Sequence, residues 1–222
     1  RLHNCKVIVR QPNIIEASLT GTFKLFLLKH IYKKLIKYAD AVIVTSNHML
    51  KEAKKNKVLE KKIFFVTNPI DLRKTRANVQ PYRVKGDKTK LIFVGRLVYQ
   101  KGIDRILYLF KKINNIELLL IGDGIEKQKL QRKVKELKIQ RNVKFLGHKK
   151  NPFKYIAGAD YFILPSRWEG LPNCVIESLA LGTPVIAFSE EGIDIEDAED
   201  YTPIIPLICS IFWPMYPQNK NM

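Results

Sequence analysis

The chain has 222 residues, of which 46% are hydrophobic and 10% aromatic, so it can bury a core, which excludes an intrinsically disordered protein. Lys and Arg number 39 against 21 Asp and Glu, and the formal net charge of +18 attracts nucleic acid, anionic lipid head groups or phosphorylated small molecules. No apolar run reaches the roughly 18 residues that a membrane-spanning helix requires.

Apolar strands alternate with amphipathic helices along the first part of the chain. Strands are predicted at 6–10, 40–46 and 62–69, and helices at 22–39 and 47–56, the second with Asn47 as its N-cap. A polar connector is expected at about 71–89.

The second part repeats the alternation more clearly. Strands are predicted at 90–95, 116–122, 142–147, 161–166 and 184–189. The apolar positions of the first helix recur at helical spacing and are Ile103, Ile106, Leu107, Phe110 and Ile113. Later helices carry Leu130, Val134 and Leu137, and "CVIESLALG" at 174–182. Near-continuous apolar strands between such helices indicate an α/β protein with a parallel sheet covered on both faces.

In parallel sheets, ligands bind where strands end and loops lead into helices. After the strand at 90–95, Gly95 lets the backbone turn close to a ligand, and Arg96 and Lys101 supply cations that suit phosphate oxygens. The alternative is that both are ordinary surface cations, and the loop taken alone favours that alternative.

Gly122 and Gly124 form half of a dinucleotide-binding fingerprint after the strand at 116–122. Lys127 stands where the third glycine belongs, which argues against an NAD-binding fold. The stretch therefore predicts a tight strand-to-helix turn beside a ligand.

Two glutamates flank a loop-to-helix turn in "SRWEGLPNCVIESLALGTP" at 166–184: Glu169 in the loop and Glu177 in the helix, which starts at Pro172 or Asn173. A carboxylate accepts hydrogen bonds from the hydroxyls of a sugar or ribose. The loop amides that can face a phosphate are those of Gly170, Leu171 and Asn173. The alternatives are solvent exposure for Glu169 and an interaction with the helix dipole for Glu177.

The stretches "GRLVYQKG", "IGDG", "NVKFLGH" and "PSRWEGLPNCVIESLALGTPVIA" occur in the order and spacing of the retaining GT-B glycosyltransferases. They resemble the large family-4 group that builds bacterial surface polysaccharides, whose mark is a Glu, seven residues and a second Glu. The resemblance covers about residues 40 to 188.

The resemblance implies a GT-B fold with a Rossmann-like donor-binding domain. The implied regions are a remnant of the N-terminal acceptor-side domain at 1–70, a linker at 71–89, the donor domain at 90–200 and an irregular tail at 201–222. We expect the chain to be incomplete at its N-terminus and its tail to depart from the family pattern.

The resemblance also implies an activity, which is transfer of a hexose or N-acetylhexosamine from a nucleotide sugar, by default a UDP-sugar, to a lipid-linked or polysaccharide acceptor with retention of configuration. Arg96 and Lys101 would bind the donor diphosphate and stabilise its developing charge. The donor would be further held by Gly95, Gly122, Gly124, Asn173 and Glu177, with Glu169 and the Gly170–Leu171–Pro172 loop on the transferred sugar. No metal and no other cofactor is implied.

Two other functions stay open. The chain could be an inactive fragment that only binds the donor, or, less favoured, a basic nucleic-acid-binding protein. Its basic residues are spread over many helices, and its aromatic residues lie mostly in apolar strands rather than as stacking platforms, which argues against nucleic acid.

The helix at 22–38 places Leu27, Leu28, Ile31, Leu35 and Tyr38 on one face, and its other face carries Lys29, Lys33 and Lys37. The favoured interpretation is a domain helix whose apolar face packs in the core. The alternative is an anionic membrane surface as partner.

The scattered cysteines, Cys5, Cys174 and Cys209, are typical of reduced thiols. We therefore expect a cytoplasmic protein, and the positive charge leaves the inner face of the cell membrane open as an alternative location.

Overall fold

The computed structural model describes residues 5–11, 23–76, 79–82 and 86–188. Its internal contacts divide the chain into two units. The first unit comprises residues 1–71 and 168–173, and the second comprises residues 72–167 and 174–222. The predicted tail at 201–222 and Cys209 lie outside the described residues.

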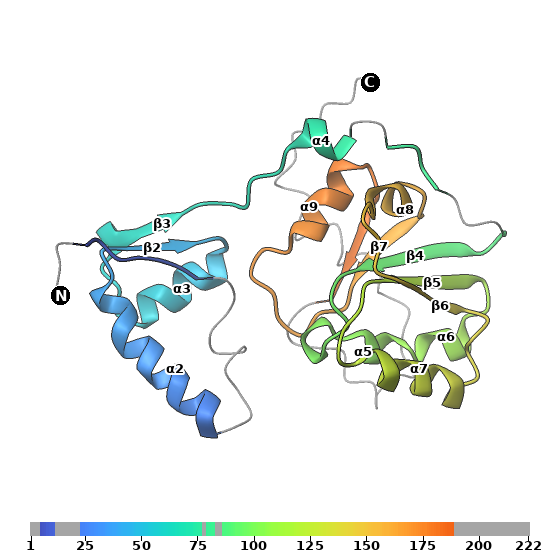
Figure 1. Ribbon diagram of the computed structural model, residues 1–222, viewed down its shortest axis with the longest axis horizontal. Helices are drawn as coiled ribbons and strands as arrows, with labels where there is room; N and C mark the ends of the chain where they lie inside the picture. Colours follow the sequence, from blue (N-terminus) through green and yellow to red (C-terminus); the bar gives the residue numbers. More distant parts are fainter. Residues whose placement is uncertain (1–4, 12–22, 77–78, 83–85, 189–222) are drawn as a thin grey trace. The chain divides into compact units, whose positions relative to one another are not determined.

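The first unit contains short parallel strands and the helices between them (Figure 1). Its elements are β1 (Ile8–Arg10), α2 (Phe23–Leu35), η1 (Ile36–Tyr38), β2 (Ala41–Val44), α3 (Asn47–Lys55), η2 (Glu60–Lys62) and β3 (Ile63–Phe65). Within the described residues, the strands form one sheet in the order β1-β2-β3, with every pair parallel. The predicted strands are therefore confirmed, although each is shorter than expected.

The N-cap of α3 is one residue earlier than predicted. Ser46 has an extended backbone, and its side-chain oxygen accepts a hydrogen bond from the Met49 N–H at 3.3 Å. Asn47, the predicted cap, is instead the first helical residue. Both residue types cap helices well, so the sequence alone does not choose between two adjacent candidates.

The prediction that the apolar face of α2 packs in the core is wrong. Tyr32 is half-buried and Ile36 fully buried, and both pack on the core of the first unit with Val42, Val44 and Met49. The residues of the predicted core face are exposed by 44–66% and are Leu27, Leu28, Ile31, Leu35 and Tyr38. The core contact is therefore made by a different stripe, with Tyr32 on α2 and Ile36 on η1.

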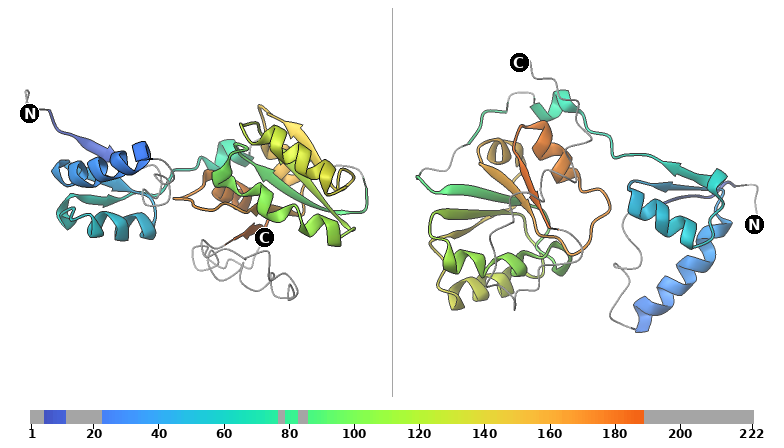
Figure 2. Two further views of the ribbon diagram at one scale, coloured as in Figure 1. Left: turned by 90° about the horizontal axis from the view of Figure 1, so that it is seen from below. Right: turned by 180° about the vertical axis from the view of Figure 1, so that it is seen from behind.

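The second unit is a layered α/β structure (Figure 2). Its strands are β4 (Thr89–Val94), β5 (Ile116–Ile121), β6 (Val143–Gly147), β7 (Tyr161–Leu164) and β8 (Val185–Ala187). Its helices are α4 (Leu72–Arg76), η3 (Tyr99–Lys101), α5 (Ile103–Ile106), α6 (Leu109–Lys112), α7 (Lys127–Glu136), α8 (Phe153–Ala157) and α9 (Asn173–Ala180), whose first residue groups with the first unit. The strands of this part of the structure form a parallel sheet in the order β6-β5-β4-β7-β8.

Both faces of this sheet are covered, as the apolar strands predict. Phe93 points to the face that packs against α5, α6 and α7, whereas its neighbour Ile92 points to the face covered by α8 and α9. Each of these two side chains is fully buried. The alternation shows that the strand is buried on both sides, as expected for a parallel sheet.

Three details of the second unit differ from the sequence interpretation. The predicted helix at 102–113 is divided into α5 and α6, and Ile113 follows α6 with extended backbone and is 41% exposed rather than in the core. A short helix, α4, occurs inside the predicted connector, and another, α8, lies between β6 and β7. The five-residue length of α4 and of α8 explains why no periodic pattern revealed these two helices. Within the described residues, no helix has the length and hydropathy needed to cross a lipid bilayer.

A buried ion-pair cluster joins the beginnings of three neighbouring strands. Glu117 on β5 forms an ion pair with Lys90 on β4, at 3.1 Å, and a second ion pair with Lys144 on β6. The side chains of Lys90 and Glu117 are 7% and 5% exposed. Burial raises the pKa of Glu117, but hydrogen bonds from Lys144 and Lys90 outweigh this and hold the pKa below its ordinary value.

We expect Glu117→Gln to destabilise the second unit by about 3 kcal/mol near neutral pH, because Lys90 stays buried without its counter-charge. The folded-state pKa of Glu117 is lowered, so its contribution is present above the unfolded-state pKa of about 4.3 and is lost as the pH falls through the folded-state value. The difference in Tm between wild type and variant, measured by calorimetry, should therefore shrink below about pH 4.

The control is Glu60→Gln, which breaks the exposed pair with Lys54 and should leave Tm unchanged. An equal loss of stability in both variants at neutral pH would contradict the account of the buried cluster.

Candidate functional site

The order of the strands in the second unit marks one position on the sheet. The chain proceeds from β4 to β5 and β6 on one side, and then places β7 and β8 on the other side of β4. The order thus reverses between β4 and β7. In open parallel sheets, the crevice outside the carboxyl ends of the strands at such a reversal is the usual ligand site.

The loop after β4 is fastened to the loop after β5 by backbone hydrogen bonds. The Gly95 N–H donates to the Ile121 carbonyl at 3.0 Å, and the Leu97 N–H donates to the Asp123 carbonyl at 2.9 Å. In return, the Glu126 N–H donates to the Leu97 carbonyl at 3.0 Å. The two loops therefore form one unit at the carboxyl edge of the sheet.

Glycine is required where these two loops touch. A Cβ atom on Gly122 would lie 1.9 Å from the Gly95 carbonyl oxygen, and one on Gly124 would lie 2.3 Å from the Leu97 carbonyl oxygen. Both glycines also have positive φ angles, 137° and 159°. The predicted tight turn is confirmed, while the role of these glycines in donor binding stays a prediction.

The two residues predicted to supply cations, Arg96 and Lys101, follow β4 at this edge of the sheet. Arg96 directly follows Gly95 and its side chain is exposed. Lys101 ends η3, and its Cε lies 3.8 Å from the position that a Cβ would take on Gly95. The structure thus brings Lys101, Gly95 and Gly122 together at the carboxyl end of β4.

Glu177 is the fifth residue of α9 and is half-buried. Burial raises the pKa of its carboxyl above the ordinary value, and no charged partner among the described residues offsets the effect. The helix dipole acts most strongly within the first helical turn, and Glu177 lies beyond that turn. A half-buried carboxylate of this kind is suited to accept hydrogen bonds from a ligand.

The loop between β7 and α9 groups with the first unit from residue 168 to 173. The predicted residues in it are Glu169, Gly170, Leu171, Pro172 and Asn173. Within that unit, the Asn68 side-chain amide donates to the Leu171 carbonyl at 2.8 Å and to the Asn173 side-chain oxygen at 2.6 Å. The proximity of this loop to Arg96 and Lys101 stays a prediction.

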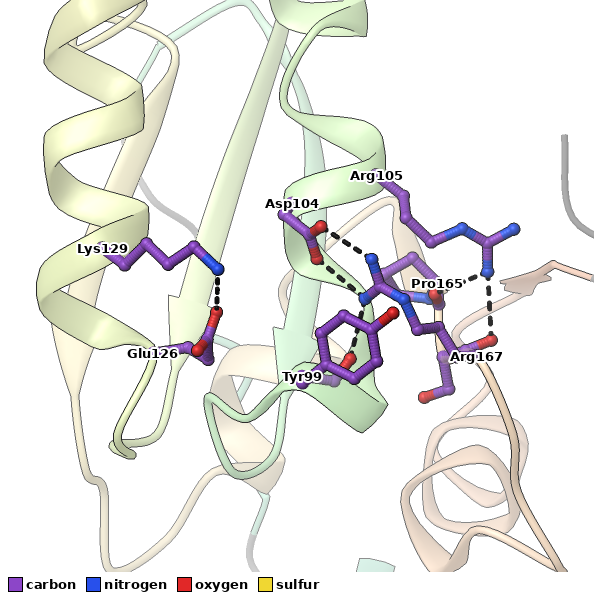
Figure 3. Close-up of polar contacts among 8 residues, drawn as sticks. Tyr99, Asp104, Arg105, Glu126, Lys129, Pro165 and Arg167 are labelled. Carbon is purple, nitrogen blue, oxygen red and sulfur yellow. Dashed lines mark hydrogen bonds and ion pairs between the residues drawn. The ribbon is translucent and has the colours of Figure 1, made fainter. Parts of the chain in front are cut away.

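Arg167 is a residue at this edge that the sequence did not single out (Figure 3). Its guanidinium donates two hydrogen bonds to the Asp104 carboxylate, at 2.9 and 2.7 Å, and one to the Tyr99 carbonyl at 2.7 Å. It also stacks on the Tyr99 ring, 3.9 Å from the ring centre. The sequence signal for Arg167 was a basic residue shortly after a buried strand. Its hydrogen-bond partners, Tyr99 and Asp104, lie more than sixty residues away in sequence, so the sequence did not reveal them.

The charges around Arg167 influence one another. Burial raises the pKa of Asp104, but the hydrogen bonds and charge of Arg167 lower it further, so the net pKa is below the ordinary value. Hydrogen bonds to Asp104 raise the pKa of Arg167. The neighbouring Arg105 has a lowered pKa because of burial and the charge of Arg167.

A cavity of 310 Å³ lies at the opposite edge of the sheet, between residues 86–90 and 157–160. Most of its polar groups are already engaged. Lys88 donates to Asn142, the Lys90 side chain pairs with Glu117, and Asp160 accepts the Lys90 N–H. The carboxyl edge, with its exposed Arg96 and with Lys101 beside Gly95, is therefore the better candidate for a ligand site.

Comparison with known proteins identifies a family. Residues 74–196 match the family described as "Glycosyl transferases group 1". An uncharacterized glycosyltransferase of Methanocaldococcus jannaschii is 36% identical over 187 residues, which cover 79% of this chain and 46% of that protein.

A second relative is the N-acetylgalactosamine-N,N'-diacetylbacillosaminyl-diphospho-undecaprenol 4-alpha-N-acetylgalactosaminyltransferase of Campylobacter jejuni. It is 30% identical over 163 residues, which cover 72% of this chain and 43% of that protein. The chain thus spans less than half the length of either relative.

Solved structures share the fold. HepE of Anabaena, in complex with UDP, superposes with a TM-score of 0.65 at 15% identity, over 82% of this chain and 53% of HepE. TarM of S. aureus superposes with a TM-score of 0.67 at 20% identity, over 89% of this chain and 39% of TarM.

The matched residues 74–196 include the strand-order reversal, the loops after β4 and β5, and Glu177. The chain belongs to the glycosyl transferases group 1 family, and its parallel-sheet, Rossmann-like fold is that of the GT-B glycosyltransferases.

Proposed function

We propose that this chain is the donor-binding part of a retaining family-4 glycosyltransferase. It binds a nucleotide sugar, by default a UDP-sugar, and serves transfer of a hexose or N-acetylhexosamine to a lipid-linked or polysaccharide acceptor. The observation that carries the proposal is the position of Lys101 at the carboxyl end of β4, where the strand order reverses within the family-matched residues.

The named activities of similar proteins support the donor and the acceptor. HepE of Anabaena was solved with UDP and with UDP-glucose. The Campylobacter jejuni relative is named for N-acetylgalactosamine transfer to a diphospho-undecaprenol-linked saccharide. Other relatives are named for lipopolysaccharide core or O-antigen biosynthesis.

In the proposed reaction, the bond between the anomeric carbon and the diphosphate breaks as the acceptor oxygen bonds to that carbon on the same face. Negative charge grows on the leaving diphosphate, and Arg96 and Lys101 stabilise it. Glu177 accepts hydrogen bonds from the ribose hydroxyls, and Glu169 with the Gly170–Leu171–Pro172 loop contacts the transferred sugar. The diphosphate receives the acceptor proton, so the scheme uses no protein nucleophile and no metal.

A second candidate function is donor binding without transfer. The chain spans 46% and 43% of the two relatives named above, so transfer by the chain alone is tested separately from donor binding. Release of labelled sugar from a UDP-sugar, or its transfer to a lipid-linked acceptor, separates the two functions.

We expect the chain to bind UDP or GDP in calorimetry, and Lys101→Ala to weaken that binding by about 10–100-fold, because a hydrogen bond to a charged group contributes about 1.5–3 kcal/mol. Lys111→Ala, an exposed lysine at the end of α6, is the matched control and should bind as wild type does. Tighter binding of a short DNA duplex than of either nucleotide at physiological salt would overturn the proposal and favour nucleic acid.

Glu177→Gln should increase stability and weaken UDP binding. The folded-state pKa of Glu177 is raised, so its ionised form costs stability, and stability declines as the pH rises through the window between the unfolded and folded pKa values. We expect a rise in Tm of about 1–2 °C at pH 7.5, measured by calorimetry, and no rise at pH 3.5. A fall in Tm at pH 7.5, with unchanged UDP affinity, would show that Glu177 is a structural residue.

We also propose that α2 contacts anionic lipids at the inner face of the cell membrane. Its exposed apolar residues are Phe26, Leu27, Leu28, Ile31 and Leu35. Exposed Lys34 and Lys37 lie in the same segment, and residues 23–38 contain no acidic side chain. An amphipathic helix with basic residues and an accessible apolar face binds anionic lipid surfaces.

Vesicle co-sedimentation tests this contact. The chain should bind phosphatidylcholine vesicles that contain phosphatidylglycerol and bind pure phosphatidylcholine poorly. Leu27→Ser combined with Ile31→Ser should reduce binding about tenfold, since each removes a buried apolar group at the interface. Equal binding to both vesicle types would remove the proposal.

A further inference from the structure

We propose that Arg167 is a positioning residue that fixes the backbone of η3, and through it Lys101, next to the loop that follows β7. The inference rests on the proposed function, because Lys101 is the residue assigned to the donor diphosphate. Arg167 acts at the strand-order reversal, since η3 follows β4 and Arg167 follows β7.

Arg167 holds η3 through both its backbone and its side chain. Its backbone N–H donates to the Gln100 carbonyl at 2.7 Å, and its guanidinium donates to the Tyr99 carbonyl at 2.7 Å. These two carbonyls precede Lys101 directly in the chain. The position of Lys101 is therefore set by a residue on the neighbouring strand's loop.

The same side chain is held from two further directions. Its fork-shaped guanidinium bonds both oxygens of Asp104, the second residue of α5, and its plane stacks on the Tyr99 ring (Figure 3). A lysine has a single ammonium group, so it cannot satisfy a carboxylate and a carbonyl in this fixed geometry while stacking on a ring.

The other side of η3 is in close contact with the β7 loop. A Cβ on Gly102, whose φ is 64°, would lie 2.0 Å from the Pro165 carbonyl oxygen. The Arg105 guanidinium donates to that carbonyl and to the Ser166 carbonyl, at 3.4 Å each. Residues 99–105 thus contact the β7 loop both before and after Lys101.

The charge on Arg167 is already neutralised by the Asp104 carboxylate. The ion pair is partly buried, with 19% and 27% of the two side chains exposed. An arginine in a bidentate pair gains little by exchanging its carboxylate for a phosphate. Its contribution to donor binding is therefore exerted through the placement of η3.

The experiment uses the whole chain and two readouts. In the first, Arg167→Met should make the amides of residues 99–104 exchange with solvent about tenfold faster, because the bonds to Tyr99 and Asp104 are lost. This measurement needs no ligand. Arg167→Lys should restore the slow exchange only in part, and Lys129→Met, which breaks the separate Lys129–Glu126 pair on α7, should not change it.

In the second readout, UDP affinity is followed by NMR titration in a double-mutant cycle. Arg167→Met should weaken UDP binding about tenfold in the wild-type background and have little further effect in Lys101→Ala, because residues that act through one another are not additive. Equal losses in both backgrounds, or unchanged exchange at 99–104, would overturn the inference. Failure of the unaltered chain to bind any nucleotide would refute the proposed function, and the exchange comparison would still decide whether Arg167 positions η3.

Discussion

Close contact between the loops that follow neighbouring parallel strands is the constraint on which the candidate site depends. The loop after β4 approaches the loop after β5 so closely that only glycine fits at Gly122 and Gly124. It approaches the loop after β7 equally closely at Gly102. Backbone hydrogen bonds join these loops to one another. The loops after the three strands therefore form one continuous edge of the sheet rather than three independent segments.

The rest of the second unit supports this edge. Its sheet is buried on both faces, which fixes the register of the strands and hence the level at which each loop begins. At the opposite ends of the strands, Glu117 joins Lys90 and Lys144 and ties β4, β5 and β6 together. Core packing therefore sets where the site lies, and the loops set what it can bind.

The sequence predicted most of the fold because buried parallel strands are apolar runs, as at Leu118–Ile121. Glycines marked the ends of several strands, and a capping residue marked the start of a helix. It failed where the deciding factor is tertiary. Ile113 lies outside the core because the predicted helix is broken, and the core contact of the segment at 23–38 is made by Tyr32 on α2 and Ile36 on η1. The partners of Arg167 come from a distant part of the chain, and no spacing rule connects them.

The central claim is that a nucleoside diphosphate binds at the carboxyl edge of the second-unit sheet, beside Gly95 and Lys101. Titration of the isotope-labelled chain with UDP, followed by backbone amide NMR, tests it most directly. The account predicts that the largest changes in amide chemical shift occur at residues 95–102 and 122–124. Largest changes at residues 86–90 and 157–160, around the cavity at the opposite edge, would contradict it.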